Sequence, residues 1–110
     1  MTKVTLFTDE KDLYCGLETK GHAFFASYGK DIVCSAVSAL VINFINSVDE
    51  LTSSAINVDM NQDEGYIKAV VSDYDKPDVQ LLFKSLKLGV TEISKEYSKN
   101  VKLTNRRCTP

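Results

Sequence analysis

The sequence of 110 residues contains no tryptophan, two prolines, five glycines and a single histidine. The scarcity of proline and glycine excludes collagen-like and low-complexity architectures, which are rich in these residues. With one histidine, a zinc site would have to be completed by scattered carboxylates, so we expect neither a metal nor another cofactor. Any catalytic proton transfer by an imidazole must use His22, because the chain offers no other.

Cysteine is also scarce, with residues 15, 34 and 108 as the only examples. An odd number of widely spaced cysteines is not typical of a disulfide-stapled secreted domain, and no pair has metal-site spacing. We therefore expect reduced thiols and a cytoplasmic protein. The N-terminus lacks the pattern of a signal peptide, and no apolar run approaches the length that spans a membrane. We expect no membrane association.

The chain has neither a long basic run nor an excess of positive charge. Its formal net charge is -2, which argues against the basic footprint over the whole surface that nucleic-acid binding favours. Arg106 and Arg107 form the densest basic pair, and we interpret them as part of a solvated tail. We predict no direct nucleic-acid partner and a single domain over residues 1–110, with a shallow active site if there is one.

Hydrophobic periodicity predicts the order β-β-α-β-β-α, with a short strand at residues 101–104 after the second helix. This order favours an α+β fold in which two helices pack on a mostly antiparallel sheet. The predicted hairpins pair residues 3–8 with 13–19 and residues 55–60 with 66–72. Leu13, Cys15 and Leu17 are expected to share one face of the first hairpin, and Ile56, Val58 and Met60 are expected to face inward from the second.

Both helices show an apolar stripe with steps of three and four residues. The first stripe runs from Val33 to Val48 and follows Asp31, a good N-cap residue. The second helix begins near Pro77, which suits the first helical position. Its expected core face is Val79, Leu82, Phe83, Leu86, Val90, Ile93 and Tyr97.

Cys34 is the candidate nucleophile. With Asp31 as the N-cap, it becomes the third helical residue, where unpaired N–H groups and the helix dipole stabilise a thiolate. Its place at the rim of the apolar stripe, one turn before Ser38, lets it face a cleft. A cysteine near a helix start is also typical of a small buried residue, so this reading stays open until a partner is found.

His22 is the candidate partner, because a thiol that attacks an amide needs a group that moves a proton. The intervening loop can fold back to bring His22 and Cys34 together, although a histidine beside glycine is also typical of a turn. Asp31 either orients His22 or only caps the helix. Ser38 is either a supporting hydroxyl or a packing residue.

The segment GHAFFASYGKDIVCSAVSAL, residues 21–40, resembles the signature of the ribosomal-processing cysteine proteases (Prp), which are small bacterial proteins. The pattern is GHA, five residues, Gly, one residue, DIVC and a run of small residues ending in VSAL. The resemblance extends over nearly the whole chain. It implies a homodimer that removes the N-terminal extension of the large-subunit ribosomal protein numbered twenty-seven, a step in ribosome assembly.

The resemblance also assigns roles. It maps the catalytic histidine onto His22 and the catalytic cysteine onto Cys34, and it implies a mobile loop consistent with Gly21 and Gly29. Relatives are expected to cut after two phenylalanines and before a small residue. Phe24 and Phe25, followed by alanine, repeat that pattern, so they either contact substrate, occupy the enzyme's own groove, or anchor the loop to the core. Oxyanion donors are expected from backbone N–H groups in the first turn of the helix.

Two other functions remain open at this stage. One is a non-catalytic, ribosome-associated binding or assembly factor in which Cys34 is structural. The other is redox chemistry, in which a second thiol resolves an oxidised Cys34; the sequence shows no nearby cysteine for that role.

Overall fold

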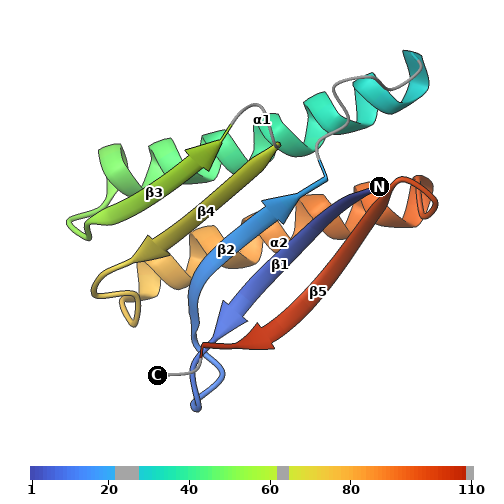
Figure 1. The fold of residues 1–110 in the computed structure, drawn as a ribbon. Helices are drawn as coiled ribbons and strands as arrows, with labels where there is room; N and C mark the ends of the chain where they lie inside the picture. The colour runs from blue at the N-terminus through green and yellow to red at the C-terminus, as the bar shows by residue number, and fades with distance from the viewer. Residues whose placement is uncertain (22–27, 62–64, 109–110) are drawn as a thin grey trace.

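The computed structural model describes residues 1–21, 28–61 and 65–108 (Figure 1). Two helices and five strands follow one another in the predicted order, and the C-terminal strand is longer than expected. The elements are β1 (Thr2–Thr8), β2 (Tyr14–Lys20), α1 (Tyr28–Leu51), β3 (Ile56–Asn61), β4 (Tyr66–Val71), α2 (Pro77–Glu96) and β5 (Val101–Arg107).

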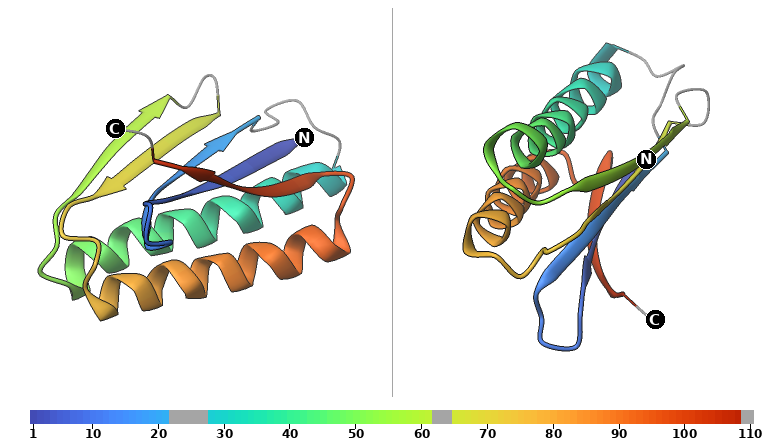
Figure 2. Two further views of the ribbon diagram at one scale, coloured as in Figure 1. Left: turned by 90° about the horizontal axis from the view of Figure 1, so that it is seen from below. Right: turned by 90° about the vertical axis from the view of Figure 1, so that its left-hand side faces the viewer.

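The five strands form one sheet in the order β3-β4-β2-β1-β5. All neighbouring strands are antiparallel except β1 and β5, which run parallel because α2 returns the chain to the same end of the sheet. Both helices lie on one face of the sheet, and the described part of the chain places no helix on the opposite face (Figure 2). The predicted α+β fold, with two helices on a mostly antiparallel sheet, is confirmed.

The core lies between the sheet and the two helices. Phe44 of α1 and Phe83 of α2 meet at its centre with ring centroids 4.5 Å apart, and Tyr14 of β2 stacks on Phe83 at 5.7 Å. Contact between large rings adds to the free energy gained by burying their area. The predicted stripes supply half of the other buried core residues, namely Val33, Val37, Val41, Val48, Val79, Leu86 and Val90, and the strands supply the rest.

The second helix begins at Pro77 as predicted, but its two ends differ from the expected core face. Tyr97 is 40% exposed and ends the helix rather than packing inside. Gln80 is buried instead, because its amide accepts the N–H of Tyr14 and donates to the carbonyls of Tyr14 and Tyr74. A buried amide is tolerated when its hydrogen bonds are satisfied in this way.

A register shift in the first hairpin corrects the predicted face of β2. Phe7 pairs with Gly16 while Thr8 pairs with Tyr14, so Cys15 is an extra residue in this strand. Such a bulge changes which face the flanking side chains occupy. Tyr14 therefore packs against the core, whereas Cys15, predicted to share a face with Leu17, lines a hollow on the other side.

The edge strand β3 also departs from prediction. Ile56 packs partly against the core, but Val58 and Met60, expected to face inward, are 36% and 43% exposed. The reason is the position of the strand at the sheet edge, where α1 makes few contacts with it.

Residues Ile32–Leu51 of α1 are long enough and apolar enough to cross a membrane by length and composition alone, contrary to the expectation that no run approaches this length. Its buried residues Val37, Val41 and Phe44 belong to the core described above. A core helix of a folded domain passes the same test, because it is apolar along one face.

The cysteines provide a further correction, because Cys15 and Cys108 form a disulfide. Cys108 directly follows β5, and its backbone N–H donates to the carbonyl of Thr8 at 2.7 Å, which brings it alongside the bulge. The expectation that all three thiols are reduced is therefore wrong for this structure. Cys34 is the one free cysteine.

Thiol titration tests this pairing. In the absence of reductant, one thiol per molecule of denatured protein is expected to react with a disulfide reagent, because only Cys34 is unpaired. After reduction, three thiols per molecule are expected to react. Tryptic mapping should show a peptide pair joined through Cys15 and Cys108. Three thiols in protein purified without reductant would contradict the disulfide.

Candidate active site

Cys34 lies further inside its helix than the sequence predicted. α1 begins at Tyr28, so Cys34 is the seventh helical residue and Asp31 is the fourth. Asp31 is therefore not the N-cap, and Gly29 lies in the helix rather than in a loop. The four N–H groups without an intrahelical partner belong to residues 28–31, one to two turns before Cys34. The predicted oxyanion donors beside Cys34 are thus hydrogen-bonded within the helix.

The side chain of Cys34 is 6% exposed. It lies on the flank of the apolar stripe, where it extends the buried surface of Val33 and Val37 instead of facing an open cleft as predicted. Among the described residues, its sulfur has one polar neighbour, the hydroxyl Oγ1 of Thr2, at 3.3 Å. Attack on a peptide therefore requires neighbouring residues to move and expose the sulfur.

Thr2 is the residue of this site that the sequence did not reveal. It is the first residue of β1, 32 positions before Cys34, and it is 6% exposed. No motif connects a strand N-terminus with a helix so far along the chain; only the packing of α1 on the sheet does. A hydroxyl at this distance can donate a hydrogen bond to the sulfur or accept one from it.

Gly21, the residue before His22, lies against Met1 and Thr2 at the same end of β1. Its φ is +84°, and a Cβ at this position would lie 2.1 Å from the carbonyl oxygen of Met1 and 3.7 Å from Cα of Thr2. Only glycine accommodates both the positive φ and the close approach. The chain therefore enters residues 22–27 beside Thr2, the residue that contacts the Cys34 sulfur.

The other predicted site residues are not all described. His22, Phe24 and Phe25 lie outside the described residues, so their predicted roles remain predictions. Ser38 is half-buried on α1, one turn after Cys34, as expected from the helical spacing. No group of three or more metal-ligating side chains occurs within residues 1–21, 28–61 and 65–108.

The chemistry of the site thus rests on one unpaired thiol. Cys15 and Cys108 are bonded to each other, so neither is left to resolve an oxidised Cys34. This pairing leaves the redox hypothesis without its second thiol. Nucleophilic attack by Cys34, or a structural role for it, are the two uses that the described geometry supports.

Comparison with known proteins finds similar sequences in one protein family. A family model described as cysteine protease Prp matches residues 1–102. The ribosomal processing cysteine protease Prp of Bacillus subtilis is 31% identical over 91 residues, which cover 79% of this chain and 81% of that protein. The protein of the same name from Staphylococcus aureus is 29% identical over 83 residues, 76% of this chain and 78% of its own.

Solved structures show the same fold. The S. aureus Prp protease in complex with a substrate peptide has a TM-score of 0.89 at 24% identity, covering 96% of this chain and 99% of its own. The same protease with a covalently linked product peptide has a TM-score of 0.86 at 25% identity and the same coverage. A Streptococcus mutans protein reaches 0.89 at 29% identity over 97% of this chain and 98% of its own.

The contact between Thr2 and Cys34 leads to a testable prediction. Thr2→Val removes the hydroxyl while keeping the side-chain shape, so the thiolate loses a hydrogen-bond donor. At about 1 kcal/mol for one hydrogen bond, iodoacetamide should alkylate Cys34 roughly fivefold more slowly near neutral pH. The rate is read by mass spectrometry of the Cys34 peptide.

Thr5→Val is the matched control. Thr5 is equally buried on the same strand, but its hydroxyl contacts Thr104 at 3.0 Å rather than the sulfur. Equal alkylation rates for the two variants would show that Thr2 does not act on the thiol.

A second prediction concerns Gly21. Gly21→Ala forces a Cβ against the Met1 carbonyl at a positive φ, so the backbone must shift. We expect a loss of about 1–3 kcal/mol in the free energy of unfolding, measured by urea denaturation, together with faster alkylation of Cys34. A variant as stable as wild type would show that this backbone position is not constrained.

Proposed function

The chain belongs to the cysteine protease Prp family, and we propose that it is a thiol endopeptidase that removes the N-terminal extension of a ribosomal protein. The proposed substrate is the large-subunit ribosomal protein numbered twenty-seven, cut after an apolar or aromatic motif. Related proteins are named ribosomal processing cysteine proteases, and one has been solved with a substrate peptide and with a covalently linked product.

One observation of this chain supports the proposal most directly. Cys34 is the free cysteine of the structure, so its thiol is available to form a covalent intermediate. It lies on α1, in the DIVC part of the signature, and its sulfur touches the strand end that the chain passes just before His22. These contacts are compatible with a Cys34–His22 pair.

In the proposed reaction, His22 takes the proton of Cys34, and the thiolate attacks the scissile carbonyl carbon. The tetrahedral intermediate collapses as the C–N bond breaks, and the His22 imidazolium protonates the departing amine. His22 then takes a proton from water, which attacks the thioester and releases the new carboxyl end and the free thiol. Thr2 is a positioning residue in this scheme, and Ser38 is a supporting hydroxyl.

The proposed setting is a homodimer in the cytoplasm, where ribosomal proteins are made. One observation points away from that compartment: the Cys15–Cys108 disulfide is of a kind that is rare in cytosolic proteins. The disulfide and the proposed site use different cysteines, so the proteolytic chemistry does not depend on which redox state prevails.

The burial of Cys34 supports a second candidate function, a binding or assembly factor without catalysis. A sulfur that is 6% exposed is typical of a structural cysteine as well as of a resting nucleophile. Cleavage assays separate the two, because a binding factor would retain its partner without shortening it.

The decisive comparison incubates the extended ribosomal protein with wild type, Cys34→Ala and His22→Ala and identifies the products by mass spectrometry. Loss of the nucleophile should lower the cleavage rate by at least about a thousandfold. Loss of the proton-transfer group should lower it by about a hundredfold or more.

Ser35→Ala is the matched control, because Ser35 is the exposed neighbour of Cys34 and should cut at the wild-type rate. If Cys34→Ala cuts as fast as Ser35→Ala, the protease proposal is wrong. If wild type binds the extended protein without cutting it, the binding factor is the better description.

A further inference from the structure

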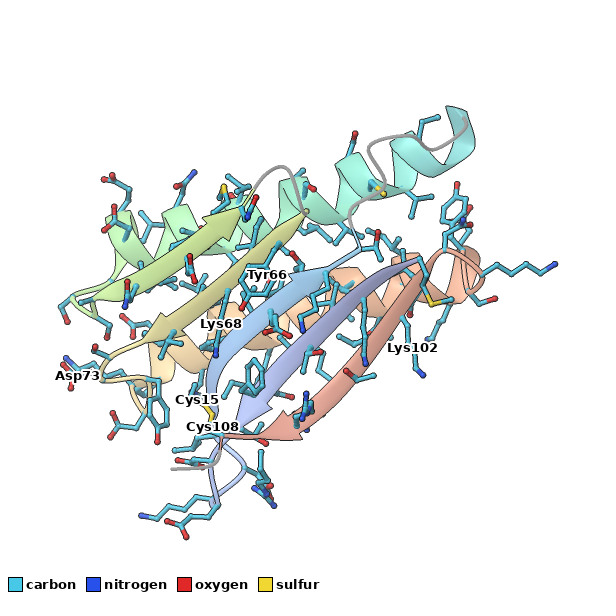
Figure 3. The ribbon with its side chains drawn as sticks, in the orientation of Figure 1. Cys15, Tyr66, Lys68, Asp73, Lys102 and Cys108 are labelled. Atoms are coloured by element: carbon cyan, nitrogen blue, oxygen red, sulfur yellow. A yellow bond between two sulfur atoms is a disulfide. The ribbon has the colours of Figure 1, made fainter. Side chains whose placement is uncertain are left out.

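The sheet face opposite the helices, here called the open sheet face, carries more cationic than anionic side chains among the described residues. Strand alternation and register identify its residues, since their neighbours Val4, Leu17 and Ala69 point into the core. The open sheet face consists of Lys3, Thr5, Phe7, Gly16, Glu18, Lys20, Asn57, Asp59, Asn61, Tyr66, Lys68, Val70, Lys102, Thr104 and Arg106. Figure 3 shows Tyr66 and Lys68 on this side, away from the helices, and Lys102 at β5.

Five of these residues are Lys or Arg and two are Asp or Glu. The chain as a whole has 13 Lys and Arg and 15 Asp and Glu, so the rest of it holds eight cations and thirteen acids. The formal net charge of -2 thus averages a cationic sheet face with an acidic remainder. The expectation that the protein has no direct nucleic-acid partner was based on this average, which hides the separation.

Three of the cations stand side by side across the sheet. Lys3 of β1 is in register with Lys20 of β2 on one side and with Lys102 of β5 on the other. Neighbouring strands are about 4.8 Å apart, and like charges directly opposite each other are destabilising. Within the described residues, only Lys20 of this row has a carboxylate partner, Glu18 at 3.5 Å. A row of like charges in which Lys3 and Lys102 have no carboxylate partner among the described residues suits an anionic ligand.

Aromatic rings lie between the cations. The ammonium group of Lys68 is 5.7 Å from the ring centroid of Phe7, and that of Lys20 is 6.0 Å from that of Tyr66. Tyr66 donates a hydrogen bond to Glu18 at 3.1 Å, and desolvation together with this bond raises the pKa of Tyr66, so its ring stays neutral. Rings interleaved with cations are the pattern on which single-stranded nucleic acids stack their bases.

A hollow of about 380 Å³ opens on this face where β5 ends. Its volume falls in the range of roughly 300–1,000 Å³ that is usual for ligand sites. Phe7, Lys68 and Arg106 are among its lining residues, and the Cys15–Cys108 disulfide forms part of its wall. Arg106 has no ion-pair partner among the described residues, whereas Arg107 pairs with Asp12 at 2.9 Å.

We propose that the open sheet face binds single-stranded RNA, with phosphates on the row of Lys3, Lys20 and Lys102 and bases stacked at the hollow beside Phe7. An acidic peptide could pair its carboxylates with the lysines, but it has no bases that could stack on the aromatic rings. If a second copy of this chain packed its own open sheet face here, the five cations of one copy would face the five cations of the other and repel them. The single-stranded nucleic acid is therefore the occupant that both the charges and the rings fit, and this binding is separate from the proposed proteolysis.

The test measures the fluorescence anisotropy of a short labelled uridine oligonucleotide with the full chain carrying Cys34→Ala. At about 50 mM salt, we expect the oligonucleotide to bind with a dissociation constant of roughly 100 μM or below. The double variant Lys3→Gln, Lys102→Gln should weaken binding at least about tenfold and reduce the salt slope by about 1.4, since each phosphate contact on a single strand contributes about 0.7.

The matched control is Lys84→Gln, Lys95→Gln, which removes the same charge from exposed positions of α2 and should change binding by less than about twofold. Phe7→Leu keeps an apolar side chain but removes the stacking surface, and we expect about tenfold weaker binding. Circular dichroism confirms that each variant is folded, and Arg106→Gln replaces the double variant if that one is not.

Four results would overturn the proposal. The first two are that the Cys34→Ala protein does not bind the oligonucleotide, or that the α2 control variant weakens oligonucleotide binding as much as the Lys3→Gln, Lys102→Gln variant does. The third is that the protein binds a polyglutamate peptide more tightly than the oligonucleotide. The fourth is that the protein forms a dimer that dissociates when Lys3 and Lys102 are replaced. The last result would identify the face as an interface between copies. None of the measurements depends on cleavage, so failure here leaves the protease proposal untouched.

Discussion

The N-terminal end of β1 is the point at which the candidate active site is assembled. Thr2 places its hydroxyl 3.3 Å from the Cys34 sulfur, and the Met1 carbonyl leaves room for nothing larger than glycine at position 21. Three segments far apart in sequence, the first strand, the entry to residues 22–27 and the flank of α1, are therefore held together by one strand end. The geometry of Cys34 follows from this packing rather than from the helix terminus that the sequence suggested.

The two faces of the sheet divide the molecule into parts with different chemistry. One face is buried under α1 and α2, and its alternating apolar residues supply the stability. The other carries the surplus of cations and the half-buried rings of Phe7 and Tyr66. Because side chains alternate along a strand, the same five strands serve both purposes without competition. The proposed proteolysis belongs to the helix side of the sheet and the proposed RNA binding to the open side.

The sequence predicted the element order, the fold class and most of the core, because the stripes of α1 and α2 and the alternation of the strands are strong periodic signals. It did not predict the bulge at Cys15, which inverts part of β2, nor the disulfide to Cys108, which depends on β5 lying beside β1. Val58 and Met60 alternate correctly, yet their exposure depends on how far α1 covers the edge strand, which periodicity does not encode.

The site was predicted in part. Cys34 is the free cysteine and contacts Thr2, while its role as the nucleophile stays a prediction. The helix start was placed four residues too late, because Asp31 is a good capping residue by type and predicted a first helical residue at position 32, whereas α1 begins at Tyr28. Thr2 could not be found in advance, since its role comes from tertiary packing alone. The roles of His22, Phe24 and Phe25 stay predictions, because these residues lie outside the described part of the chain.

The central claim is that the Cys34 sulfur forms a covalent bond with the substrate. Acid quenching of the reaction within its first turnover, followed by peptide mapping, tests it directly. The account predicts an acyl adduct with the mass of the N-terminal product on the Cys34 peptide. Cleavage of the extended ribosomal protein without any adduct on Cys34 at early times, under conditions in which product accumulates, would contradict it.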